Sequence, residues 1–145
     1  MNSLAVAIEE SGFATIIATT PHLYPALSAL HILGIALTIG PILVVDLRYL
    51  GLLKVPSLDP VISLLQRVSM TGFRIALPTG AALFTVQAVD YVQNPAVWLK
   101  AGLLLLAGLN AALAPRLPGR DRLVGAASLL LWLGILAAGR WIAFV

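Results

Sequence analysis

The feature that most constrains the fold of this chain is its series of long apolar segments. Short stretches that hold most of the charges and prolines separate these segments. Hydrophobic residues make up 60% of the 145-residue chain, and charged residues make up only 10%. Soluble domains contain about 25% charged residues, so this chain has too few to cover a water-soluble globule. We therefore expect the lipid bilayer to surround most of the polypeptide.

The apolar segments predict an all-α membrane protein, a bundle of four transmembrane helices within residues 23–145. A helix that rises 1.5 Å per residue needs about 20 apolar residues to cross a bilayer core. Residues 1–22 instead mix apolar positions with Glu9 and Glu10, which are costly at the bilayer centre, so they predict an amphipathic helix in the interface. The predicted spans are about 24–46, 67–89, 97–114 and 123–142.

The basic residues predict the orientation of the bundle. Basic side chains concentrate on the cytoplasmic side of inner-membrane proteins. Seven of the nine lie on one side of the predicted spans, and only Lys100 and Arg140 lie on the other. This distribution predicts a bacterial inner-membrane protein with both termini in the periplasm. The seven are Arg48, Lys54, Arg67, Arg74, Arg116, Arg120 and Arg122.

Small residues recur at four-residue spacing in the later spans. Because lipid removes the hydrophobic drive between helices, close approach at small side chains is a common way for them to pack. We expect these positions to pack helices within one chain, with a homodimer interface as the alternative. They are Gly72, Ala76 and Gly80, then Gly108 and Ala112, then Gly134 and Ala138.

His31 is the candidate cofactor-binding residue, because it lies about two turns inside the first predicted span. An imidazole at this depth can ligate a b-type haem, relay protons or contact a quinone. The alternative is a neutral histidine that is hydrogen-bonded to a polar side chain of the next helix. Gln87, at a comparable depth in the second span, is the first choice for that partner. His22, nine residues earlier, does not complete a convincing ligand pair with His31.

Two pairs of opposite charges lie near the predicted membrane boundaries. We expect Asp46 and Arg74 to neutralise each other on the cytoplasmic side, and Asp90 and Arg140 to do so on the other side. Isolated pairs near a boundary do not make an ion path through about 30 Å of lipid, so a structural role is favoured for both.

Catalytic and metal-binding patterns are missing from the sequence. It contains no Gly-rich phosphate loop and no His-Glu-x-x-His pair. Two histidines without any cysteine make a protein-bound zinc or copper site improbable, so no metal site is predicted. No block of basic residues indicates nucleic-acid binding. We expect the protein not to be an enzyme.

Several segments together resemble a family of small four-helix bacterial membrane proteins of unknown function. The resemblance covers nearly the whole chain, and its most specific part is the spacing from the histidine to Asp-Leu-Arg. It implies that His31, Asp46, Arg48, Lys100 and Arg140 belong to the family pattern. The segments are Tyr24-Pro25-Ala26-Leu27, Ala29-Leu30-His31-Ile32-Leu33-Gly34, Asp46-Leu47-Arg48, Asn94-Pro95-Ala96 and Gly139-Arg140.

The function expected from these observations is that of an accessory or anchoring subunit of a membrane complex. Its partners would be other membrane subunits or further copies of the chain. A distant similarity in size and layout to copper-resistance membrane domains and small b-type cytochromes supports an alternative, an electron-transfer subunit that uses His31.

Overall fold

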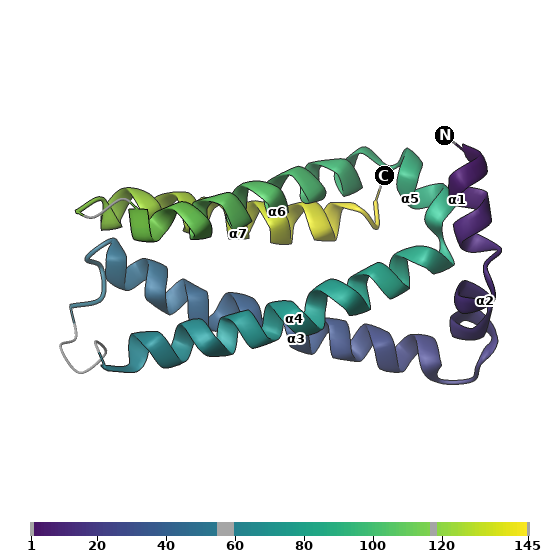
Figure 1. The fold of residues 1–145 in the computed structure, drawn as a ribbon, viewed down its shortest axis with the longest axis horizontal. Coiled ribbons are helices and arrows are strands. Elements are labelled where there is room, and N and C mark those ends of the chain that lie inside the picture. The colour runs from purple at the N-terminus through teal and green to yellow at the C-terminus, as the bar shows by residue number, and fades with distance from the viewer. Residues whose placement is uncertain (1, 55–59, 117–118, 145) are drawn as a thin grey trace.

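The computed structural model describes residues 2–54, 60–116 and 119–144, and this part of the chain is helical, without strands (Figure 1). Four long helices lie in two pairs, and three short helices gather at one end of them. The elements are α1 (Asn2–Glu9), α2 (Gly12–Thr19), α3 (Leu23–Tyr49), α4 (Ile62–Val86), α5 (Ala88–Gln93), α6 (Pro95–Leu113), the 3₁₀ turn η2 (Ala114–Arg116) and α7 (Asp121–Trp141).

The N-terminal segment forms two helices, α1 and α2, where the sequence predicts one. The break falls at Ser11, whose hydroxyl accepts a hydrogen bond from the Ala14 amide at 3.3 Å and so caps α2. The two helices lie across the end of the long helices (Figure 1), with α1 against α5 and α2 against α4. Whether they rest in a membrane interface stays a prediction.

Helices α3 and α4 form the closest packed pair, and they cross near their middles (Figure 1). Glycines on both helices let the backbones touch: a Cβ at Gly34 would lie 2.7 Å from the Ala76 nitrogen, and one at Gly72 would lie 2.5 Å from the Thr38 nitrogen. The Ser69 hydroxyl also donates a hydrogen bond to the Thr38 carbonyl at 2.8 Å. The predicted small-residue face of the second span therefore packs within the chain.

Helices α6 and α7 form the second pair, which two asparagines join near its ends. Asn94 accepts a hydrogen bond from the Ala96 amide, which caps α6, and donates one to the Ile142 carbonyl at 3.0 Å. At the opposite end, Asn110 donates to the Val124 carbonyl at 3.2 Å.

The two pairs meet mainly where α3 contacts α7. A Cβ at Gly125 would lie 2.9 Å from Cβ of Tyr49 and 3.1 Å from the Asp46 carbonyl oxygen. Helix α4 approaches α7 through Phe73 and Trp132, whose rings meet edge to face with centroids 6.4 Å apart. Elsewhere the pairs diverge.

Among the described residues, three helices are long and apolar enough to cross a membrane: Leu23–Tyr49, Pro95–Arg116 and Asp121–Trp141. Their bounds agree with three of the predicted spans to within a few residues, and many of their large apolar side chains are exposed. The fourth prediction, residues 67–89, corresponds to α4, which is 25 residues long but less apolar. Arg67 and Arg74 lower its hydropathy, so its crossing of the bilayer stays a prediction.

Candidate functional site

His31 lies in the contact between α3 and α4. Its Nδ1 is 2.9 Å from the Ala76 carbonyl oxygen and 3.1 Å from the Thr79 hydroxyl. A carbonyl oxygen only accepts hydrogen bonds, so Nδ1 carries the proton and donates it, which leaves Nε2 with its lone pair. Gly80 makes room for the ring, because a Cβ there would lie 2.7 Å from Cε1.

Gln87, the predicted partner of His31, lies elsewhere in the fold. It is exposed at the break between α4 and α5, where its backbone leaves the helical conformation (φ −137°, ψ 45°). None of the hydrogen bonds recorded for the described residues joins it to His31. The sequence could not show this break, because no proline or glycine marks it.

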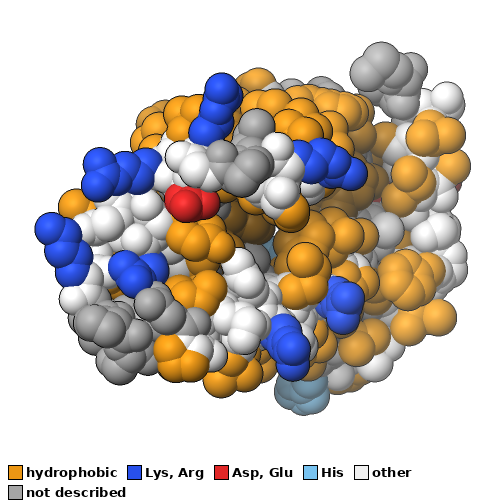
Figure 2. All heavy atoms as spheres, turned by 60° about the vertical axis from the view of Figure 1, so that its left-hand side comes forward, with side chains coloured by type: hydrophobic (Ala, Val, Ile, Leu, Met, Phe, Trp, Pro, Cys, Tyr) orange, Lys and Arg blue, Asp and Glu red, His pale blue; other side chains and the backbone are white. Residues whose placement is uncertain are grey.

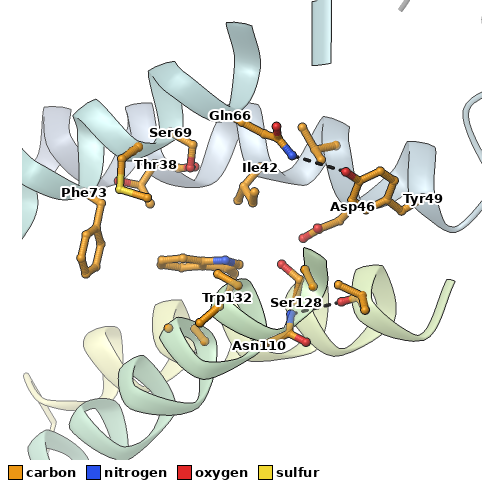
Figure 3. A pocket seen from close by; sticks show the side chains of 18 of the residues that line it. Thr38, Ile42, Asp46, Tyr49, Gln66, Ser69, Phe73, Asn110, Ser128 and Trp132 are labelled. Carbon is orange, nitrogen blue, oxygen red and sulfur yellow. Dashed lines mark hydrogen bonds between the residues drawn. The ribbon is translucent and has the colours of Figure 1, made fainter. Parts of the chain in front are cut away.

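Asp46 is buried in α3, with 3% of its surface exposed, and it points into the space between the helix pairs (Figure 3). Its Oδ2 is buried and has no hydrogen-bond partner within the described part of the chain. The Ser128 hydroxyl on α7 lies beside this carboxyl group and can donate a hydrogen bond to it (Figure 3). A buried carboxyl oxygen without a hydrogen-bond partner lowers the stability of the fold. Asp46 is therefore the polar side chain of the bundle that most calls for a functional explanation.

The predicted pair of Asp46 with Arg74 is not found among the described residues. The glycine contacts set an antiparallel register in which Thr38 faces Gly72, so Asp46 faces the first turn of α4. Arg74 therefore lies about ten residues further along α4, roughly 15 Å away at 1.5 Å per residue. Its side chain is also exposed, away from the space that Asp46 faces.

A cavity of about 540 Å³ surrounds the Asp46 carboxyl group, between the two helix pairs (Figure 3). Its walls are mostly apolar and include the rings of Phe73, Trp132 and Tyr49. Asp46 is the one charged residue among those that line it. The other polar lining residues are Thr38, Gln66, Ser69, Asn110 and Ser128.

The sequence pattern predicts Asp46 only as half of a charge pair and does not indicate the cavity. Ser128 and Trp132 carried a weak signal, since both interrupt an otherwise aliphatic stretch of the last span. Both residues line the cavity together with Asp46, next to the point where Gly125 brings α7 against α3.

At the opposite end of the bundle, the predicted pair of Asp90 and Arg140 is also not found within the described ranges. Both side chains are exposed. The Arg140 guanidinium lies 4.5 Å from the centre of the Phe144 ring, a cation–π contact. Lys100 runs along Gly139, where its Nζ would lie 3.4 Å from an added Cβ.

Glu9 and Tyr91 make the polar contacts of this end. A Glu9 carboxylate oxygen accepts a hydrogen bond from the Val89 amide at 2.9 Å, which satisfies a free N–H at the start of α5. Tyr91 stacks on Phe84 with ring centroids 5.6 Å apart. Burial, with a smaller effect from the Tyr24 hydroxyl, raises the pKa of Tyr91, so its phenol stays neutral over a wide pH range.

Comparisons with protein-family models, with curated proteins and with solved structures found no match.

Proposed function

We propose that this chain is a four-span protein of the bacterial inner membrane that serves as a non-enzymatic accessory or anchoring subunit of a membrane complex. The observation that supports this proposal is the distribution of apolar surface. Large apolar side chains remain exposed along all the long helices, while the connections between these helices are short. A protein of this kind acts within the plane of the bilayer, through lipid or through other helices.

The proposal includes α4 as the fourth span. Its 25 residues would extend about 37 Å at 1.5 Å per residue, enough for a bilayer core. Its close contact with α3 favours a shared environment for both helices. Arg67 lies in the second turn of α4, so its long side chain can extend to the cytoplasmic headgroups. Arg74 is the central residue of α4, about 18 Å from its start at 1.5 Å per residue, so the proposal places it at membrane depth.

The natural absence of cysteine makes this topology directly testable. Single cysteines at Ser3 and Gln93 should react with a membrane-impermeant maleimide applied to the periplasmic face. Cysteines at Lys54 and Gly119 should react only after the membrane is disrupted. If Lys54 and Gln93 became labelled from the same face, α4 would not cross, and the four-span proposal would be wrong.

The subunit proposal predicts a stoichiometric partner. The tagged chain, extracted from its native membrane in mild detergent, should co-purify with another membrane protein or with further copies of itself. A matched preparation with an unrelated four-span protein controls for adhesion between detergent-solubilised proteins. Recovery of this chain alone as a monodisperse monomer would contradict the proposal.

The second candidate is electron transfer at His31, and the bond to the Ala76 carbonyl favours it. Metal-bound histidines commonly donate their other ring N–H to such a carbonyl, which leaves the free nitrogen for the ligand. This reading predicts a haem absorption spectrum that is lost in His31→Ala and retained in His22→Ala, the matched control. Purified protein without a haem spectrum would exclude the haem form of this candidate.

A further inference from the structure

We propose that the cavity between the helix pairs binds a lipophilic organic amine in its protonated form, with the Asp46 carboxylate as the counter-ion. This inference does not depend on the proposed function. Three features of the cavity lead to this ligand class.

The first feature is the missing partner of Asp46. Removing a carboxyl group from water is costly, and one contact with Ser128 offsets little of that cost. No Lys or Arg is among the described residues that line the cavity, so none of these side chains can neutralise the carboxylate. A cationic ligand would supply the missing charge and the missing hydrogen-bond donor together.

The second feature is that several polar groups in the wall already donate to the protein. Ser69 donates to the Thr38 carbonyl, and the Thr38 hydroxyl donates to the Gly34 carbonyl at 2.7 Å. Asn110 donates through its amide nitrogen to Val124. The hydroxyl oxygens of Ser69 and Thr38 and the side-chain carbonyl of Asn110 retain lone pairs, so the cavity is rich in acceptors. An ammonium group, which only donates, complements this arrangement.

The third feature is the size and character of the walls. A cavity of about 540 Å³ lies within the range of about 300–1,000 Å³ that is typical for small-molecule sites. Apolar side chains and the rings of Phe73 and Trp132 would contact the hydrocarbon part of a ligand, and ring faces attract a cation. The surface is hollowed at this end of the bundle, and basic side chains lie around the rim (Figure 2). The ligand therefore needs a bulky apolar body and a single cationic group.

The test compares two probes of the same shape on the purified full-length protein. Isothermal titration in mild detergent should show that 2-(1-naphthyl)ethylamine binds at least tenfold more tightly than 2-(1-naphthyl)ethanol, which lacks the charge. Asp46→Asn should weaken amine binding at least tenfold and leave alcohol binding nearly unchanged. Asp90→Asn removes an exposed carboxylate far from the cavity. This variant should bind the amine as tightly as the parent protein does.

A second pair of variants tests the site if Asp46→Asn does not fold. Gly108→Leu adds volume at the cavity wall without a clash, because an added Cβ meets nothing within 4 Å, and it should weaken amine binding at least tenfold. Gly102→Leu, equally free of contacts but outside the lining, should not. The proposal is overturned if the amine does not bind the parent protein, if amine and alcohol bind equally, or if the Asp46 or Gly108 variant binds as the parent does.

Discussion

Replacing Gly72 with leucine is expected to separate α3 from α4 and to cause the largest loss of folded protein among single substitutions in this chain. A Cβ at this position would lie 2.5 Å from the Thr38 nitrogen and 2.7 Å from the Gly34 carbonyl oxygen. Both contacts are with backbone, which cannot rotate away as a side chain can. We expect a cost of about 3 kcal/mol, at the upper end of the range for overpacking.

Thermal unfolding in detergent, followed by circular dichroism, measures this effect. Gly40→Leu is the matched control, since it adds the same side chain to α3 at a position where a Cβ meets nothing within 4 Å. The unfolding temperature of Gly40→Leu should lie within a few degrees of that of the parent protein. Gly72→Leu should lose most of its folded yield. Equal stability of the two variants would show that the α3–α4 contact is not close.

Replacing Gly125 with leucine is expected to move the two helix pairs apart while each pair stays intact. Gly125 is where α7 touches α3, at Tyr49 and at the Asp46 carbonyl. The glycine contacts within the α3–α4 pair and the asparagine bonds within the α6–α7 pair are untouched by this change. Helix content should therefore remain, while the cavity around Asp46 widens.

Pulsed electron spin resonance can measure this separation on the cysteine-free background. Labels at Leu64→Cys on α4 and Leu113→Cys on α6 occupy exposed positions on the two pairs. The label-to-label distance should become longer and more broadly distributed in Gly125→Leu. With Gly102→Leu as the added substitution, the distribution should match the parent. An unchanged distribution in Gly125→Leu would show that this contact does not set the spacing of the pairs.

The positions of most long helices could be predicted because apolar runs and strong stop signals determine them locally. Asn94 followed by Pro95 places the start of α6, and the span that begins near Tyr24 differs from α3 by only a few residues. The division of the N-terminal segment was not predicted, because Ser11 and Gly12 interrupt an amphipathic pattern without the proline that usually marks a break.

The pairing of polar side chains could not be predicted because it depends on the register between helices. The similar distance of Asp46 and Arg74 from a membrane boundary predicts that they pair. The backbone contact between Gly34 and Gly72 sets a different register, and spacing along one helix carries no information about it. Small residues alone did not identify the interface either, since Gly108 has the same spacing as Gly72 but meets nothing within 4 Å.

The bond from the Val89 amide to the Glu9 carboxylate has a consequence for biosynthesis. Its two residues are 80 positions apart, so a ribosome that adds about 5–20 residues per second needs roughly 4–16 s to make the second after the first. During that interval α1 has no α5 to rest on, and the N-terminal helices reach their final place only after α4 and α5 have been made. Helices α1 and α2 are thus translated before α4 and α5 but reach their final place after them, and until then they are available to membrane-insertion factors or chaperones.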